Sequence, residues 1–104
     1  MPDDPALVAR DLDAAVRDII AHVLMVDIAE VEPHRALLAE LGAESIDFLD
    51  LVFRIEDVVG KKIPLSEWQE FVSERLPGAD LSTAITVAIV QEFARCQSAR
   101  EKVL

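Results

Sequence analysis

Hydrophobic residues recur every three or four positions over the first quarter of the chain, which is the repeat of an amphipathic α-helix. The spacing predicts a helix over residues 5–25, with Asp4 as its N-cap and Pro5 in its first turn. His22, near the end of this helix, is expected to be a surface cation rather than a metal ligand, because no second ligand lies at helical spacing. The predicted core stripe consists of Val8, Leu12, Ala15, Val16, Ile19, Ile20 and Val23.

Residues 27–40 lack this repeat and contain Pro33, which blocks a continuous helix, so they predict a long connecting loop. A loop of this length in so small a domain indicates either a function or a crossover between distant helices. Three leucines are expected to pin it to the core, Leu37, Leu38 and Leu41.

Residues 45–59 predict a second helix that ends at Gly60 and has two apolar stripes instead of one. The first stripe is a normal core face, made by Phe48, Leu51, Val52, Ile55 and Val59. The second stripe is made by Ile46, Leu49 and Phe53, and its acidic flanks by Asp47, Asp50, Glu56 and Asp57. This second stripe either packs beneath the long loop or stays exposed as a strip that a partner protein recognises.

The remaining residues predict two further helices after an extended link over 61–65. Ser66 is expected to cap a helix over 67–76 and to form a capping box with Gln69, and Pro77-Gly78 stops that helix. A last helix is predicted over 83–101, fraying from residue 96, with Cys96 as a small buried hydrophobe. The pattern therefore predicts an all-α, four- or five-helix bundle with a long first connection, formed as one domain over residues 1–104.

The amino-acid composition limits the fold classes and the kinds of partner that this chain can have. The 104 residues are 52% hydrophobic but only 5% aromatic, which suits packed helices better than a β-sandwich. A formal net charge of -10 disfavours nucleic acid and anionic lipid, and it either steers the protein toward basic partners or serves solubility alone. The single cysteine excludes an internal disulfide, and neither a signal peptide nor a membrane span is evident, so we expect a soluble, cytoplasmic monomer.

Ser45 is the residue whose chemistry needs an explanation. It could simply cap the second helix, or it could be an exposed attachment point. A serine hydrolase is excluded because the Gly-x-Ser-x-Gly turn is absent and only His22 and His34 could act as a base. One cysteine and two isolated histidines do not make a metal site, so we predict neither catalytic nor metal-binding residues.

The surroundings of Ser45 resemble the acyl carrier protein family. The similarity runs through Leu41-Gly42-x-x-Ser45-Ile46-Asp47 and Asp50-Leu51-Val52, and it continues through Glu56-Asp57 and Gly60-Lys61-Lys62-Ile63-Pro64. The resemblance implies that Ser45 carries 4′-phosphopantetheine, whose thiol holds an acyl group as a thioester. It also implies a partner surface made by Glu44, Ile46, Asp47, Leu49, Asp50, Phe53, Glu56 and Asp57.

Two residues depart from the family's pattern. Glu44 stands where the family usually has Asp, so recognition by the phosphopantetheinyl transferase could be weaker. Arg54 interrupts the acidic flank and either tunes the choice of partner or is an ordinary solvated residue.

The run Ile63-Pro64-Leu65-Ser66-Glu67-Trp68 is similar to specialised carriers that handle very-long-chain or hydroxylated acyl groups for lipid A. That resemblance implies ketoacyl synthases and an acyltransferase as further partners. The helix at 66–76 either enlarges an acyl pocket or only adds core. A carrier for polyketide, aminoacyl or sphingolipid assembly remains an alternative, as does an unmodified helical adaptor.

Overall fold

The structure, a computed structural model, describes residues 5–100 and the side chains of residues 10–99. Five α-helices and one short 3-10 helix make up the fold of this part. No strand occurs in this described part, which confirms the predicted all-α class. The predicted long connection between the first two helices is present, and so is the helix predicted near residues 66–76. The elements are α1 (Pro5–Leu24), η1 (Ile28–Glu30), α2 (Asp47–Val59), α3 (Leu65–Arg75), α4 (Leu81–Ala84) and α5 (Val87–Arg100).

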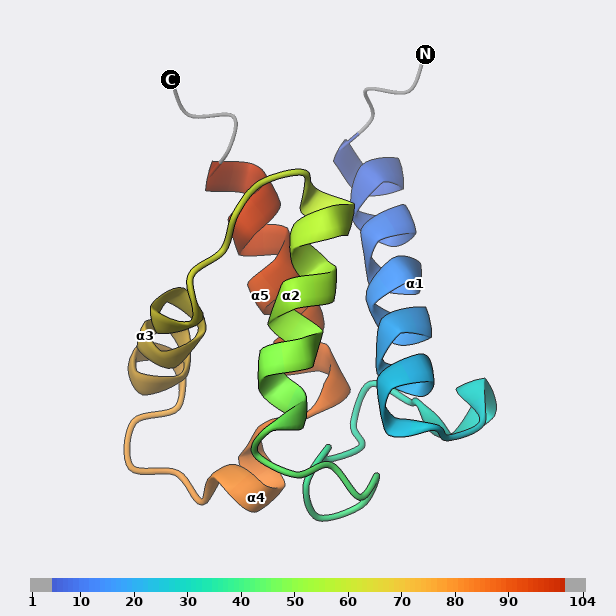
Figure 1. Ribbon diagram of the computed structural model, residues 1–104, viewed down its shortest axis with the longest axis vertical. Coiled ribbons are helices and arrows are strands. Elements are labelled where there is room, and N and C mark those ends of the chain that lie inside the picture. The colour runs from blue at the N-terminus through green and yellow to red at the C-terminus, as the bar shows by residue number, and fades with distance from the viewer. Residues whose placement is uncertain (1–4, 101–104) are drawn as a thin grey trace.

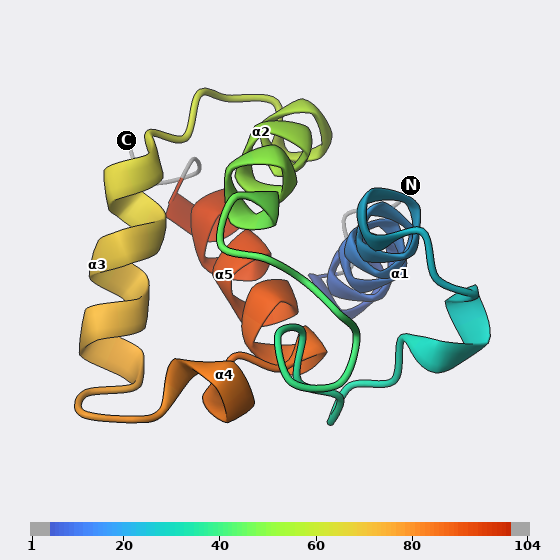
Figure 2. The ribbon, with the colours of Figure 1, turned by 60° about the horizontal axis from the view of Figure 1, so that its bottom comes forward.

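Helices α1, α2 and α5 pack against one another, and α3 lies on the far side of α2 and α5 from α1 (Figures 1 and 2). The long connection, the start of α2 and α4 meet at one end of the bundle, the lower end in Figure 1. The core between the helices is mostly aliphatic, and it also contains the buried rings of Phe48, Trp68 and Phe93. Its largest fully buried side chains are Val16, Ile20, Val31, Leu37, Leu51, Ile55, Val87, Val90 and Phe93.

Helix α1 follows the predicted stripe. Leu12, Val16 and Ile20 are buried, and Ile19 and Val23 are partly buried against the same core. His22 is exposed in the last turn, as expected. The predicted cap Asp4 and the side chain of Val8 lie outside the described residues.

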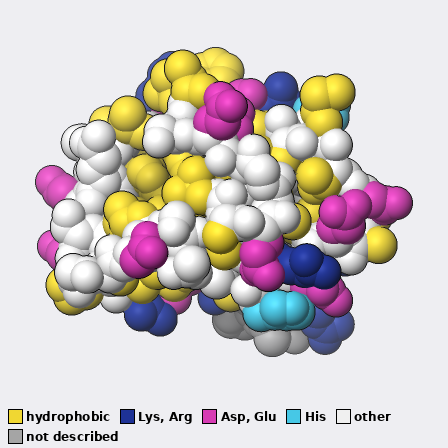
Figure 3. All heavy atoms as spheres, turned by 90° about the horizontal axis from the view of Figure 1, so that it is seen from below, with side chains coloured by type: hydrophobic (Ala, Val, Ile, Leu, Met, Phe, Trp, Pro, Cys, Tyr) yellow, Lys and Arg dark blue, Asp and Glu magenta, His cyan; other side chains and the backbone are white. Residues whose placement is uncertain are grey.

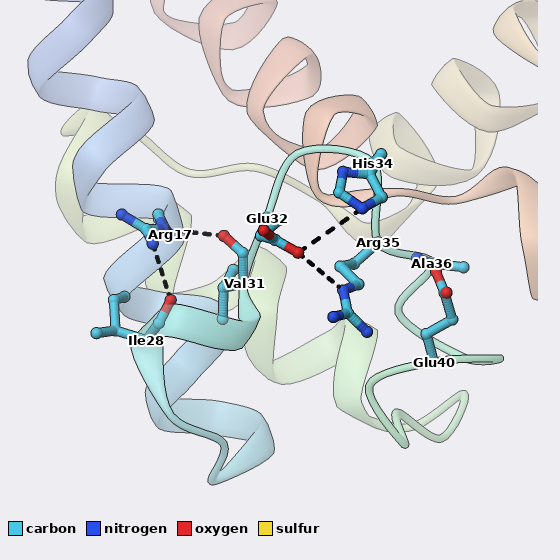
Figure 4. A network of polar contacts seen from close by, with 8 residues as sticks. All are labelled: Arg17, Ile28, Val31, Glu32, His34, Arg35, Ala36 and Glu40. Atoms are coloured by element: carbon cyan, nitrogen blue, oxygen red, sulfur yellow. Dashed lines mark hydrogen bonds and ion pairs between the residues drawn. The ribbon is translucent and has the colours of Figure 1, made fainter.

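The first half of the long connection is fastened to α1 by Arg17 (Figure 4). Its Nε donates to the carbonyl of Val31 and its Nη2 to that of Ile28, each at 2.9 Å. The bond to Val31 satisfies a carbonyl that accepts from no other described backbone N–H, and the bond to Ile28 adds a second donor to a carbonyl that already accepts from Val31 N at 3.1 Å. Leu37 and Leu41 are buried, so the prediction that leucines pin this segment to the core is confirmed.

The second half of the connection pairs with residues just before α5. Ala36 and Thr86 form an isolated antiparallel bridge, and Leu37 N donates to Ile85 O at 3.0 Å. Within the connection, Glu40 Oε1 accepts from Ala36 N at 2.8 Å (Figure 4). The long segment is therefore held by backbone and side-chain bonds at both of its ends.

This pairing overturns the prediction of one last helix over 83–101. The helix is interrupted at Ile85 and Thr86, so that α4 ends before them and α5 begins after them. Ile85 is buried in the core, and the backbone at 85–87 bonds to the long connection instead of continuing the helix. Asp80 caps α4 by accepting from Ser82 N at 3.1 Å.

Two predictions about α5 are also wrong. Residues 96–100 remain helical instead of fraying, since Gln97 is buried and donates to Glu67 Oε1 on α3 at 3.2 Å. Cys96 is exposed rather than buried, because it lies on the outward side of α5 between the buried Ala94 and Gln97. Residues 101–104 lie outside the described part of the chain.

The predicted start of α3 is wrong by two residues. Pro64 is the N-cap residue and the helix begins at Leu65, so Ser66 lies inside the first turn and forms neither a cap nor a capping box with Gln69. The helical spacing of Trp68, Phe71, Val72 and Leu76 predicts one core face for this helix, and that prediction is confirmed, with Phe71 and Leu76 partly buried. Trp68 and Val72 are buried.

Candidate functional site

Ser45 lies in the turn before α2 and not at the helix N-cap. The N-cap residue is Ile46, and no side chain caps the helix there, so the predicted helix start at residue 45 and the capping role of Ser45 are both wrong. The Ser45 side chain is exposed, and its hydroxyl makes no hydrogen bond with any described residue. The hydroxyl is therefore accessible for chemistry.

The turn around Ser45 is closed by its neighbours. Asp47 Oδ2 accepts from Glu44 N at 2.8 Å, while Asp47 N donates to Glu44 O at 2.9 Å. This reciprocal pair performs one half of a capping box, which frees Ser45 from that task. Ser82, at the start of α4, behaves differently, because its hydroxyl donates to Asp80 Oδ1 at 2.8 Å.

An apolar groove with a volume of about 620 Å³ begins beside Ser45 and runs between α2, α3 and α4. The hollow is visible from below in Figure 3, where hydrophobic side chains gather left of the centre of the view. Only three of its lining side chains are polar, Ser45, Gln69 and Ser73. The apolar lining residues are Leu38, Ile46, Phe48, Leu49, Leu65, Trp68, Val72, Leu81 and Ile85.

An aromatic cluster holds α3 against the rest of the bundle and supplies part of the groove wall. Phe48 and Trp68 stack with their ring centroids 5.5 Å apart, and Phe93 meets Trp68 edge to face at 5.2 Å. Phe71 meets Phe93 at 5.3 Å. Helix α3 therefore contributes to the core and also lines the groove.

The sequence did not identify the opposite wall of the groove. Leu38, Leu81 and Ile85 come from segments brought together by the backbone pairing of the long connection with residues 85–87. No local spacing links these three positions, so no signal in the sequence could have found them.

The second apolar stripe of α2 is exposed. Ile46, Leu49 and Phe53 have exposed fractions of 70%, 53% and 60%, so the stripe does not pack beneath the long connection. We call these three residues the outer strip. Together with Asp50 they line a shallow recess of about 450 Å³ on the surface of α2.

The acidic residues of the predicted partner surface are not equivalent. Asp47 closes the turn at Ser45, and Glu56 Oε2 accepts from Ile63 N at 2.7 Å, which fastens the link after α2. Asp50 accepts from Arg54 Nε at 3.0 Å. The other two acids, Glu44 and Asp57, are exposed, and their carboxylates make no hydrogen bond or ion pair with described residues.

The carboxyl group of Asp80 has a clearly perturbed pKa. The Ser82 hydroxyl and then its backbone N–H lower the pKa of Asp80 below 3.8, because both donate to the ionised carboxylate. Within residues 10–99, no three His, Cys, Asp or Glu side chains gather closely enough to hold a metal ion. None of the described helices is both long enough and apolar enough to cross a membrane.

Comparison with known proteins gives consistent matches. A sequence model of the family described as "Phosphopantetheine attachment site" matches residues 14–73, which include Ser45. The chain is 44% identical over 59 residues to the acyl carrier protein AcpXL of Rhizobium etli. It is 42% identical over 59 residues to the proteins of that name in Rhizobium meliloti and Brucella melitensis. Each alignment covers 57% of this chain and between 62% and 64% of the relative, so the chain spans less than two thirds of these relatives.

Proposed function

The chain belongs to the phosphopantetheine attachment-site family, and from this premise we propose that it is an acyl carrier protein whose Ser45 carries the 4′-phosphopantetheine arm. The observation that supports this assignment best is the position of one hydroxyl. The Ser45 side chain is exposed, makes no hydrogen bond with described residues, and lines the mouth of an apolar groove.

The attachment step needs nothing from this chain except an accessible hydroxyl. The Ser45 oxygen attacks the β-phosphorus of coenzyme A, a phosphodiester forms, and 3′,5′-ADP leaves. A base of the transferase takes the hydroxyl proton, so the absence of a histidine beside Ser45 in the sequence is no obstacle. The N–H groups of Ser45 and Ile46 have no acceptor among the described residues, and both can face the attached phosphate.

The groove suits the acyl chain of the resulting thioester. Its volume of about 620 Å³ is that of an ordinary small-molecule site, and nine of its twelve lining residues are apolar. Each methylene that leaves water for such a lining contributes about 0.8 kcal/mol. A long acyl chain therefore gains more from this groove than a short one.

The acyl cargo in this proposal is a long or hydroxylated fatty acid destined for lipid A. Its support is the similarity of the segment from Ile63 to Trp68 to specialised carriers, together with relatives named acyl carrier protein AcpXL. The partners are a phosphopantetheinyl transferase, ketoacyl synthases and an acyltransferase. They meet the outer strip and the acids beside it.

In the same proposal the chain is a carrier and not an enzyme, and it works as a monomer in the cytoplasm. Residues 1–104 form a single carrier domain. One continuous hydrophobic core, extending from Leu12 on α1 to Ala94 on α5, supports the assignment of a single domain.

Mass spectrometry of the intact protein tests the attachment. The wild-type chain, incubated with coenzyme A and a broad-specificity phosphopantetheinyl transferase, should gain the mass of one phosphopantetheine. Ser45→Ala should gain nothing, whereas Ser82→Ala, which removes a hydroxyl already bonded to Asp80, should gain as the wild type does. A folded wild-type protein that gains no mass beside a working positive control would make the unmodified adaptor the better assignment.

A further inference from the structure

Arg54 is the only basic residue of α2, and it lies one turn after Asp50 on the outer side of the helix. Its Nε donates to Asp50 Oδ1 at 3.0 Å. The two side chains have exposed fractions of 42% and 47%, so the pair lies at the surface and not in the core. Asp50 is therefore not the bare anion that the sequence indicates.

The pair divides the charge along the outer side of α2. Toward Ser45, Glu44 is exposed and unpaired among the described residues, and Asp57 is likewise unpaired near the other end of the helix. Between these two acids the surface presents Leu49 and Phe53 with a cation beside them. A partner protein that binds along α2 therefore contacts an acidic residue at each end of this surface and an apolar centre with one positive charge between them.

The guanidinium of Arg54 can bind more than Asp50. It has five N–H donors, and the bond to Asp50 uses only the one on Nε. An exposed ion pair of residues four apart on a helix is weak and screened by salt, so a partner's carboxylate can share or replace Asp50 at little cost. Planar paired binding of a carboxylate is the geometry that arginine favours.

We propose that Arg54 determines which enzymes dock on α2. The partner that fits this surface has an apolar pocket for Leu49 and Phe53, cations toward the Ser45 end, and a carboxylate facing Arg54. A docking surface that is uniformly basic is disfavoured, because its central cation meets the positive charge of Arg54. This inference rests on the proposed carrier function, and it adds a charge requirement on the partner.

The test measures binding without modification. The Ser45→Ala protein, which lacks the attachment hydroxyl, is titrated at low salt with a purified phosphopantetheinyl transferase chosen for a basic docking surface. Adding Arg54→Gln should lower the Kd about three- to tenfold, since it removes the repelling charge and frees Asp50. Adding Asp50→Asn instead should raise the Kd, because it leaves Arg54 without its counterion.

Arg75→Gln is the matched control. It changes the net charge by the same amount and also breaks an exposed ion pair, that of Arg75 with Glu92 on α5, but Arg75 lines neither the groove nor the recess of the outer strip. Its effect on the Kd should be less than about twofold. Equal effects of Arg54→Gln and Arg75→Gln would overturn the proposal, since net charge alone would then explain the binding.

A charge exchange on the partner completes the test. When the transferase cations of the docking surface are changed to glutamate one at a time, one variant should bind the chain with Arg54 more tightly than the Arg54→Gln chain. If every variant prefers Arg54→Gln, the proposal is wrong. Failure of the carrier function itself would be seen separately, as a wild-type Ser45 that gains no phosphopantetheine.

Discussion

The inner and outer sides of α2 carry the same kinds of side chain, but the inner side is buried and the outer side is exposed. Phe48 on the inner side has an exposed fraction of 8%, whereas Phe53, only five residues later, has one of 60%. The inner leucine, Leu51, is likewise buried, and the outer one, Leu49, is about half exposed. Residue type therefore does not separate core from surface on this helix. Position around its axis does.

The difference lies in what each side meets. The inner side packs on α1 and α5, and through Phe48 it stacks on Trp68 of α3. The outer strip is covered by no described element, although exposed aromatic and aliphatic groups are costly to keep in water. An exposed apolar strip beside an exposed serine hydroxyl is the arrangement expected of a surface that partner proteins bind.

The largest expected effect comes from emptying the inner side. Ile55→Ala removes a side chain that is 1% exposed, and the resulting cavity should lower the free energy of unfolding by about 3 kcal/mol. Urea denaturation measures this. A loss under about 1 kcal/mol would mean that the inner side is packed less tightly than described.

A smaller effect on stability is expected for Glu56, which lies between the inner and outer sides of α2. Glu56→Ala should lower the free energy of unfolding by about 1–2 kcal/mol, because it removes the carboxylate that accepts from Ile63 N at 2.7 Å. The neighbouring Asp57→Ala is the control and should change stability by less than about 0.5 kcal/mol. If the two variants were equally stable, the role of Glu56 in fastening the link after α2 would be refuted.

On the outer side of α2, a substitution should weaken partner binding while leaving the free energy of unfolding almost unchanged. Phe53→Ala should change the free energy of unfolding by less than about 0.5 kcal/mol, since the ring is largely exposed already. The same substitution should weaken binding to the phosphopantetheinyl transferase about fivefold, by removing an apolar anchor. Calorimetric titration and urea denaturation of one preparation test both halves. A strongly destabilised Phe53→Ala would show that the outer strip belongs to the core.

The smallest effect concerns the N-cap of α4, which lies outside α2. The pKa of Asp80 is lowered by Ser82, so the bonds of its carboxylate stabilise the folded chain above about pH 3.8, the pKa of an ordinary aspartate. That stabilisation is lost as the pH falls through the lower pKa of the folded state. The difference in unfolding free energy between the wild type and Asp80→Ala should thus be constant near neutral pH and shrink in acid. A difference that grows in acid would contradict this sign.

Much of the fold could be predicted from local pattern. The two stripes of α2, its stop at Gly60 and the core face of α3 follow from spacing alone. The interruption at Ile85 and Thr86 could not be predicted, because it depends on pairing with Ala36, about fifty residues away.

The site was predictable to a similar degree. The sequence singled out Ser45 and the exposed strip, but it treated the acids of α2 as one group. Their division depends partly on local bonds, such as that of Asp47 with Glu44, and partly on a bond beyond the helix, that of Glu56 with Ile63. The first could have been recognised from an acid three residues after Glu44, since this is the spacing of a capping box. The second required the path of the chain after α2.

In the proposed function, Ser45 delivers an acyl chain to the groove beside α2, which Ile46 and Leu49 help to line, and leaves Phe53 of the outer strip free. Trp68 is the only tryptophan of the chain and lines that groove. Loading Ser45 with a pantetheine arm that bears a bromine-labelled long acyl chain makes its fluorescence a direct reporter, because bromine quenches an indole that it contacts. We predict strong quenching relative to the same arm without the acyl chain. Unchanged emission from a fully loaded protein would show that the acyl chain lies outside the groove, and the proposed delivery would be wrong.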